Sequence, residues 1–380
     1  MKNRIYLDYA ATPPATQAEP CEALRAGTAL IGNSSSIHQE GVKAKKMLEI
    51  ARRKTAAFFG GRPEEIIFTS GGTESNNLAI FGAIGTGKHA ITTVIEHSSV
   101  LECFRELEKR GVEVDYLPVN NEGILELKIL EKALRPETAL VSVGYANGEI
   151  GVIQPIGKIS KLLLDSVIFH IDASQAPLYL NCEKETLGAD LITVDGHKIY
   201  GPLGAGALFI RRGIKLKPLM FGGGQENGLR PGTENLPAIV GLADALESAK
   251  KNRGKESLRL TKLRDFFIAE IEKEIPNAIL NGDRDKRLPN IINFSFSGKE
   301  AEFLALQLDA AGIAVATKSA CLKNERESYV IKALGGDLNR ATSSIRFSFG
   351  KDTKKSDLEY TVKVLRKLIL RRNIDKEFCD

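Results

Sequence analysis

Two short apolar runs, each followed by polar residues, constrain the fold of this chain more than any other feature. Val167 to Ile171 is followed by Asp172, and Leu191 to Val194 leads into the polar turn that holds Lys198. Runs of this length, rich in β-branched residues, are typical of buried strands in a parallel sheet. Ligands of such sheets bind beyond the carboxyl ends of the strands. We therefore expect two neighbouring strands to present a carboxylate and an amine to one crevice.

Asp172 and Lys198 together suit pyridoxal 5'-phosphate (PLP). The aldehyde of this cofactor needs a lysine amine, and its ring nitrogen needs an acidic partner to stay protonated. A purely structural ion pair between the two residues is the alternative. The motifs in the rest of the chain favour the cofactor site.

The composition is that of an ordinary globular protein, with 43% hydrophobic and 27% charged residues. The chain of 380 residues is too long for one ordinary hydrophobic core, so we expect two domains.

The net charge is only +5, with both signs interleaved, so we expect no nucleic-acid role. Without an apolar signal segment or a membrane-length apolar run, a cytoplasmic enzyme is the expectation. The five cysteines are widely spaced without a CxxC pair, which predicts reduced thiols and no metal site.

A glycine-rich turn separates a predicted strand, EEIIFTS, from a predicted helix, TESNNLAIFGAIG. Glycines at such a turn let the backbone close on an anion, and the free amides of the helix N-terminus donate to it. Gly71, Gly72 and Thr73 are thus a candidate phosphate cup. Many turns of this kind bind nothing, and Thr73 as a simple N-cap is the alternative.

His97 and Asn147 follow two further predicted strands, HAITTVIE and Ala139 to Tyr145. At a strand end an imidazole could stack on a cofactor ring or move protons. The alternative is a residue that merely precedes the helix beginning at Ser98. Asn147 lies in a predicted strand-to-helix loop, so we expect its amide to point into the same crevice. The alternation of strands and helices predicts a largely parallel sheet covered on both faces.

The long loop FGGGQENGLRPGTENLP follows another predicted strand, GAGALFIRR. Loops of this length tend to be functional, and Arg230 and Thr233 in it could serve a neighbouring subunit. We predict one helix from Pro237 to about Lys250 and another from Leu258 to Ile275. The charge-rich segment KKNRGKES between them is the predicted domain boundary.

Arg346 and Cys321 are the candidate functional residues of the C-terminal part. Arg346 interrupts the apolar strand from Ile345 to Phe349. A buried guanidinium there would require an anion such as a substrate carboxylate, whereas a solvent-facing arginine is the alternative. Cys321 lies in a polar loop between Lys318 and Lys323. Structural cysteines are usually buried in regular elements, so a nucleophile on a mobile loop is the better interpretation.

Several motifs, in this order, resemble those of the cysteine desulfurases among the class-V aminotransferase-like, fold-type I PLP enzymes. They are YLDYAATPP, FTSGGTESNNLAI, EHSSVLE, NGEIGV, HIDASQ, GHKIYGPLGAGAL, GGGQENGLRPGTEN, SAC and SSIRFSFG, nearly end to end. The resemblance implies an α/β fold whose large PLP-binding domain, residues 15–253, has a mostly parallel sheet covered by helices. Residues 1–14 and 254–380 would form a smaller α/β domain that carries the catalytic cysteine loop.

The resemblance implies that four residues of this sequence contact the cofactor ring or its aldehyde. Lys198 would be the Schiff-base lysine, and Asp172 would hold the ring nitrogen. Gln175 would contact the ring oxygen, and His97 would stack on the ring.

The resemblance also implies that Gly72, Thr73 and His197 bind the phosphate, while Thr233 reaches the partner's site in a homodimer. Asp195 departs from the family, whose members usually have a serine there that donates to the phosphate. A carboxylate would repel this group unless it were protonated or turned away to cap a neighbouring turn. We expect it to face away.

The substrate assignments complete the resemblance. Asn147 and Arg346 would hold the carboxylate of L-cysteine. Cys321 would take its sulfur, leaving alanine and a persulfide for an acceptor protein in iron–sulfur cluster assembly or tRNA thiolation. Lys318 differs from the usual loop and leaves the acceptor open. A selenocysteine lyase, another class-V lyase or aminotransferase, and a non-catalytic scaffold are the alternatives; the loop cysteine favours the desulfurase.

Overall fold

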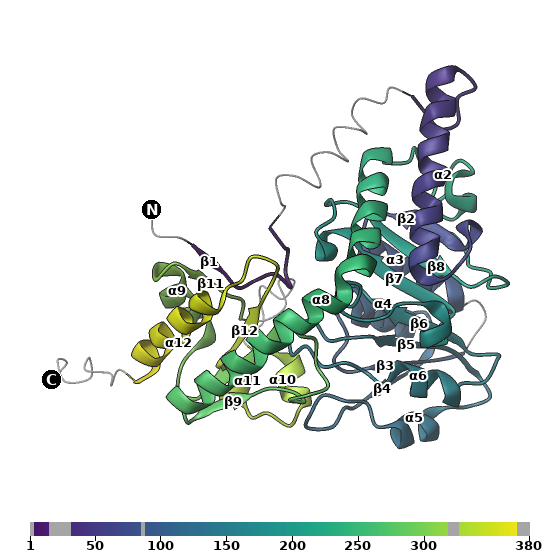
Figure 1. Ribbon diagram of the computed structural model, residues 1–380. Coiled ribbons are helices and arrows are strands. Elements are labelled where there is room, and N and C mark those ends of the chain that lie inside the picture. The colour runs from purple at the N-terminus through teal and green to yellow at the C-terminus, as the bar shows by residue number, and fades with distance from the viewer. Residues whose placement is uncertain (1–3, 15–31, 85–87, 318–326, 371–380) are drawn as a thin grey trace.

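The computed structural model describes residues 4–14, 32–84, 88–317 and 327–370. Figure 1 shows a sheet covered by helices, and a smaller group of elements beside it that contains both ends of the described chain. The long helix α8 (Leu236–Glu274) runs from one group to the other. In this described part, no helix is long and apolar enough to cross a membrane.

The main sheet has seven strands in the order β2-β8-β7-β6-β5-β3-β4. The five from β7 to β4 are parallel, whereas β8 runs antiparallel to both of its neighbours. The predicted largely parallel α/β sheet is therefore confirmed. The strands are β2 (Ile66–Thr69), β3 (His89–Thr93), β4 (Glu113–Leu117), β5 (Thr138–Gly144), β6 (Ile168–Asp172), β7 (Leu191–Asp195) and β8 (Gly206–Ile210).

The two strands that constrain the fold most, β6 and β7, are neighbours as predicted. They pair in parallel, with Asp172 of β6 opposite Thr193 of β7. Their carboxyl ends therefore lie at the same edge of the sheet. This edge receives Asp172 directly and Lys198 through the 3₁₀ turn η3 (Gly196–Ile199) that follows β7.

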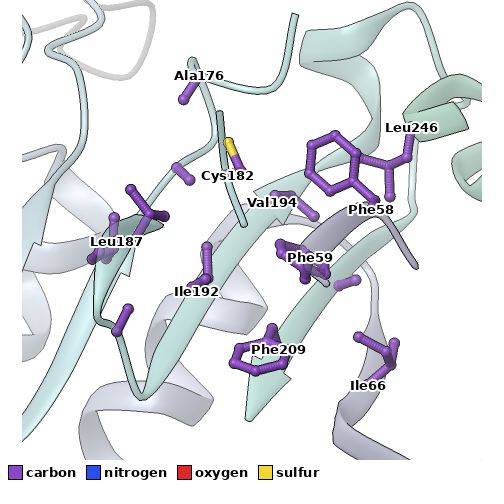
Figure 2. Packing of buried hydrophobic residues seen from close by; sticks show 14 of the residues in the cluster. Phe58, Phe59, Ile66, Ala176, Cys182, Leu187, Ile192, Val194, Phe209 and Leu246 are labelled. Atoms are coloured by element: carbon purple, nitrogen blue, oxygen red, sulfur yellow. The ribbon is translucent and has the colours of Figure 1, made fainter. Parts of the chain in front are cut away.

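Short helices and one long helix cover the main sheet. Helix α2 (Gln39–Phe59) follows the N-cap His38, and its C-cap is Gly60, whose φ of 66° suits glycine. Its terminal Phe58 and Phe59 pack with Phe209 of β8 in the buried cluster of Figure 2. The other elements are η1 (Pro63–Glu65), α3 (Gly72–Ile84), α4 (Ser98–Lys109), α5 (Leu127–Ala133), α6 (Ile156–Ile159), η2 (Ser160–Leu162), α7 (Lys184–Leu187) and η4 (Gln225–Gly228).

Helix α8 corrects the predicted pair of helices, because it continues for 39 residues through the segment KKNRGKES. Lys, Arg and Glu are good helix formers, so a charged segment need not be a linker. Leu242 packs in the cluster of the main sheet, whereas Phe267 packs in a second cluster. One helix thus belongs to two cores, and the division of the chain into domains stays a prediction.

The second group of elements combines the start of the described chain with its C-terminal part. Its three-stranded sheet is antiparallel in the order β12-β10-β9, and β1 pairs in parallel with β11. The elements are β1 (Ile5–Tyr6), β9 (Ala278–Leu280), β10 (Ile291–Phe296), α9 (Ala301–Ala310), β11 (Ile313–Ala314), α10 (Tyr329–Ala333), α11 (Leu338–Thr342), β12 (Ser344–Ser348) and α12 (Lys355–Leu370).

Candidate active site

A cavity of about 300 Å³ lies at the carboxyl ends of β5, β6 and β7, beside the first turns of α3 and α4. The fold brings most of the predicted site residues to its wall. They are Gly72, Thr73, His97, Asn147, Asp172, Gln175, Asp195, His197, Lys198 and Arg346. Thr233 is exposed in the loop before α8 and does not line this cavity. Cys321 lies outside the described residues.

Asp172 ends β6, and donors from two directions hold its carboxylate. Its Oδ1 accepts hydrogen bonds from the backbone N of Ser174 at 2.9 Å and from the hydroxyl of the same residue at 2.6 Å. Its Oδ2 accepts one from Asn76 Nδ2 at 2.8 Å. Helix α3 and the turn after β6 thus fix the carboxylate at the cavity.

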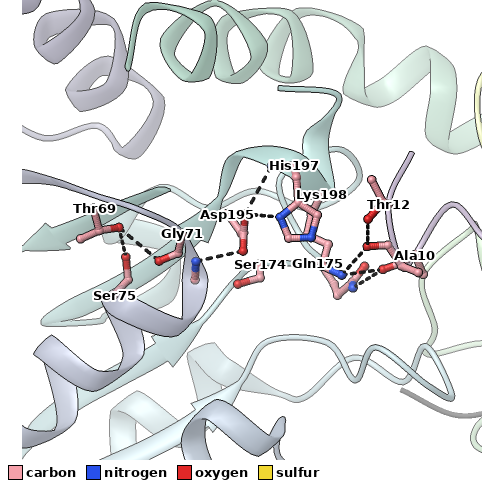
Figure 3. Close-up of polar contacts among 12 residues, drawn as sticks. Ala10, Thr12, Thr69, Gly71, Ser75, Ser174, Gln175, Asp195, His197 and Lys198 are labelled. Atoms are coloured by element: carbon pink, nitrogen blue, oxygen red, sulfur yellow. Dashed lines mark hydrogen bonds and ion pairs between the residues drawn. The ribbon is translucent and has the colours of Figure 1, made fainter. Parts of the chain in front are cut away.

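Lys198 reaches across the cavity to the N-terminal segment. Its Nζ donates to the carbonyl oxygens of Ala10 at 2.9 Å and Ala11 at 2.8 Å. Gln175 Nε2 donates to the same oxygen of Ala10 at 3.0 Å (Figure 3). The sequence did not indicate this role for Ala10 and Ala11, because carbonyl oxygens leave no signal in residue types.

The predicted phosphate cup is a tight turn between β2 and α3. Thr69 Oγ1 donates to the carbonyl of Gly71 and hydrogen-bonds Ser75 Oγ, so the turn is held from both sides. Gly71 has a φ of 155°, which only glycine adopts readily. The backbone N of Gly72 points out of the turn toward the end of β7.

Asp195 occupies this cup, which corrects the expectation that it faces away. Its Oδ1 does cap the turn after β7, accepting from the backbone N of His197 at 3.3 Å and lying 2.6 Å from His197 Nδ1. Its Oδ2, however, accepts from the backbone N of Gly72 at 2.9 Å. A carboxylate has several acceptor positions, so it can cap one turn and close another. Figure 3 shows this bridge.

His97 caps a helix at the wall of the cavity. It is the N-cap of α4, where its Nδ1 accepts from the backbone N of Ser99 at 3.2 Å and lies 2.8 Å from Ser99 Oγ. It also lines the cavity. The cap fixes the ring at the cavity, where it can face a bound group.

Arg346 is buried, as the functional interpretation of its strand position predicted. Its Nη2 donates to Asp8 Oδ1 at 2.7 Å and its Nη1 to the carbonyl of Gly148 at 2.8 Å. Its Nε is buried without a hydrogen-bond partner within the described part of the chain. Because a buried N–H is costly to leave unpaired, this atom suits an incoming anion.

Asn147 lines the cavity, but its amide also orders its own loop. Its Nδ2 donates to the carbonyl of Ile95 at 2.8 Å. Its Oδ1 accepts from the backbone N of Glu149 at 2.9 Å and of Ile150 at 3.0 Å. One N–H of the amide has no bond among these and is the group that could bind a ligand.

Glu96 and Asn76 line the cavity and were missed from the sequence. Burial raises the pKa of Glu96 to about 7, and the charge of Asp172 adds to this shift. Its carboxylate accepts from Thr93 Oγ1 at 2.6 Å and from the backbone N of Gly144 at 2.7 Å. Asn76 follows Gly72 by one helical turn, and that spacing was a usable signal.

Cys103 and Cys182 are buried. Burial raises the pKa of each thiol to about 12, so neither is a thiolate near neutral pH. Both are therefore poor nucleophiles. The remaining three cysteines of the sequence lie outside the described residues.

Comparison with known proteins gives consistent matches over almost the whole chain. Residues 5–361 match the family model described as Aminotransferase class-V. The chain is 48% identical to "Cysteine desulfurase IscS" of Dictyoglomus turgidum over 97% of this chain and 95% of that protein. It is 41% identical to "Cysteine desulfurase IscS 1" of Archaeoglobus fulgidus over 96% and 97%. The solved structure of a "NifS-like protein" superposes with a TM-score of 0.91 and 33% identity, covering 96% of this chain and 99% of that one.

Proposed function

The chain belongs to the class-V aminotransferase family and is a cysteine desulfurase, and we propose that Lys198 binds PLP for the conversion of L-cysteine to L-alanine. The observation that carries this proposal is the set of groups converging on one cavity. Lys198 with its amine, Asp172 with its carboxylate and Arg346 with its guanidinium all line it.

The residues of the cavity fit PLP in kind and position. The cofactor requires an amine, an acidic partner for its ring nitrogen and donors for its phosphate. Asp172 and Lys198 stand at the ends of adjacent parallel strands, and Gly72 opens a helix. Bound PLP would supply an electron sink for charge that develops on the α-carbon of the substrate.

Some residues of the cavity would hold the cofactor, and others would transfer protons. Asp172 would hold a proton on the ring nitrogen through its fixed carboxylate. Lys198 Nζ would move the proton of the substrate α-carbon. His97 would stack on the ring, and Gln175 would donate to its oxygen. Thr73 and His197, with Gly72 and Asp195, would surround the phosphate.

Arg346 and Asn147 would bind the carboxylate of L-cysteine. Asp8 and Gly148 hold the guanidinium of Arg346 in the strand β12, so its Nε is fixed before the substrate arrives. A fixed donor loses little entropy when it binds an anion. The charge of the buried guanidinium, together with the amide of Asn147, would orient the α-carbon toward Lys198.

Cys321 would accept the sulfur. Its thiolate attacks the sulfur of the bound cysteine, an S–S bond forms as the carbon–sulfur bond breaks, and the electron pair stays on carbon. A proton on that carbon then completes the alanine side chain. The persulfide on Cys321 would pass its outer sulfur to an acceptor protein.

The relatives named IscS suggest the wider setting of this reaction. We place the chain in the cytoplasm as a homodimer in which Thr233 reaches the site of the partner. The sulfur would serve iron–sulfur cluster assembly or tRNA thiolation.

Incubation with L-cysteine and a reductant, with sulfide and alanine measured together, tests the proposed reaction. Equal yields of both products are expected. Formation of 3-mercaptopyruvate together with an aminated acceptor, without sulfide, would contradict desulfuration and indicate transamination.

A further inference from the structure

The carboxylate of Asp195 bridges two elements at the base of the candidate site. It accepts from the backbone N of Gly72 at the start of α3 and from the backbone N of His197 in η3. Cβ atoms placed on Gly71 and Gly72 would lie 3.5 Å and 3.1 Å from its Oδ2. The carboxylate therefore lies directly against the two glycines that form the cup.

Asp195 is negatively charged in this position. Burial acts to raise its pKa, but the hydrogen bond and charge of His197, the amide of Gly72 and the charge of Lys198 together hold that pKa below its usual range. The cup thus already contains one anion that belongs to the chain.

A phosphate in the same cup would need the amide that Asp195 uses. A fully ionised phosphate carries two charges and only acceptor oxygens, so it would meet the carboxylate with repulsion and no hydrogen bond. A phosphate that keeps one proton can donate it to the carboxylate. Free phosphate monoesters lose this proton at about pH 6.

We propose that Asp195 makes this cup selective for a singly protonated phosphate ester, so that binding of the cofactor takes up one proton. This inference rests on the proposed function, because the ester is taken to be the phosphate of PLP. The proton comes from solvent, lies between a phosphate oxygen and Asp195, and returns to solvent when the cofactor leaves. A serine at this position would donate to the phosphate and need no such proton.

Other charged groups near Asp195 could also take up or release protons on binding. His197 and Lys198 stand next to it on η3, and Asp172 belongs to the neighbouring strand β6. The remaining titratable groups at the wall of the cavity are Glu96, His97, Glu149, Tyr329 and Arg346. A comparison between variants that differ only at Asp195 cancels their contributions to first order.

The test measures PLP affinity of the cofactor-free protein against pH for wild type, Asp195→Asn and Asp195→Ser. Asn keeps the shape and an acceptor for Gly72 without the charge, and Ser supplies a donor. Asp244→Asn on α8, paired with Lys54, is the matched control for lost charge away from the cavity. Above about pH 6, the ratio of the wild-type dissociation constant to that of Asp195→Asn should rise about tenfold per pH unit. Asp244→Asn should follow the wild type.

Calorimetry in two buffers of different ionisation enthalpy counts the protons directly. At about pH 8, wild type should take up about one proton more per PLP bound than Asp195→Asn. A ratio of dissociation constants that does not change with pH, or equal proton counts, would overturn the inference.

Inorganic phosphate separates this inference from the cofactor assignment. It should raise the thermal unfolding midpoint of the cofactor-free wild type more at about pH 6 than at about pH 8. For Asp195→Asn, it should raise the midpoint at both pH values. Equal midpoint shifts for the two proteins at both pH values would contradict the role of Asp195. Failure of every variant to bind PLP would contradict the cofactor assignment alone, because the phosphate result still decides the role of Asp195.

Discussion

Asn76 Nδ2 donates a hydrogen bond to Asp172 Oδ2 at 2.8 Å, so helix α3 fixes the carboxylate at the end of β6. The same amide donates to Ser99 Oγ of α4 at 2.9 Å. Three elements therefore meet at the group that would hold the ring nitrogen of the cofactor. Its position depends on the helix as well as on its own strand.

Asp172→Asn should leave PLP bound but lower kcat by at least about 10²-fold, because a neutral amide cannot hold the ring proton. Ser174→Ala is the matched control. It removes one donor to Asp172 but keeps the charge, so it should lower kcat only severalfold. Absorbance would report bound cofactor, and alanine production would report turnover. Near-normal alanine production by Asp172→Asn would remove this residue from the mechanism.

Lys198→Ala should abolish the borohydride-reducible chromophore of the PLP complex. Among the described residues lining the cavity Lys198 is the only lysine, so no other amine there can take its place. The measurement is the absorbance of the purified protein before and after borohydride. A chromophore that persists and is reduced in the variant would assign the cofactor lysine elsewhere.

Arg346→Lys should raise KM for L-cysteine by about 10- to 100-fold, since it loses the unpaired Nε and the fork geometry. PLP affinity should change little, because the guanidinium is assigned to the substrate. Arg284→Lys, on the surface and paired with Glu272, is the control and should behave as wild type. An unchanged KM with weakened PLP binding would assign Arg346 to the cofactor.

Glu96 should make stability depend on pH. Its folded-state pKa of about 7 lies above the ordinary 4.5, so the native state binds more protons than the unfolded state between these values. The contribution of Glu96 to stability therefore falls as pH rises through that window and is constant above it. Urea unfolding of cofactor-free wild type and Glu96→Gln, from about pH 5 to about pH 8, measures the difference. The free energy of unfolding of wild type relative to the variant should fall as pH rises to about 7; a constant difference would show that the carboxyl titrates normally.

The strands that carry the site were predictable because their short runs are mostly apolar and β-branched, although His170 and Thr193 interrupt them. Buried strands such as β6 and β7 need apolar residues on both faces, and the polar residue that ends each run marks the edge of the sheet. The edge strand β4 was missed, because its sequence EVDYL alternates charge with apolar residues and is only partly buried.

Neither the length of α8 nor the orientation of Asp195 could be predicted from the sequence, and the two reasons differ. A charged segment with one glycine has no local signal that separates a linker from a solvated helix, and only packing of both ends on two cores decides. The direction of the Asp195 carboxylate depends on an amide 123 positions away in the sequence, at Gly72. Local sequence preferences explain why Asp195 caps the backbone N of His197, two residues away, but not why it also accepts from Gly72.

The residue that receives the sulfur is the central claim, and it falls on Cys321, outside the described residues. The two buried cysteines have pKa values raised to about 12 and are poor nucleophiles. Of the other three, Cys321 is the candidate thiolate, because Lys318 and Lys323 flank it in the sequence. Cys321→Ser should keep the PLP spectrum but release almost no sulfide.

Mass spectrometry of peptides from the wild type, after treatment with L-cysteine and without reductant, tests this claim most directly. The account predicts one extra sulfur atom on the peptide that contains Cys321 and none on the peptides of Cys103 or Cys182. An extra sulfur on another cysteine, with Cys321 unmodified, would contradict it.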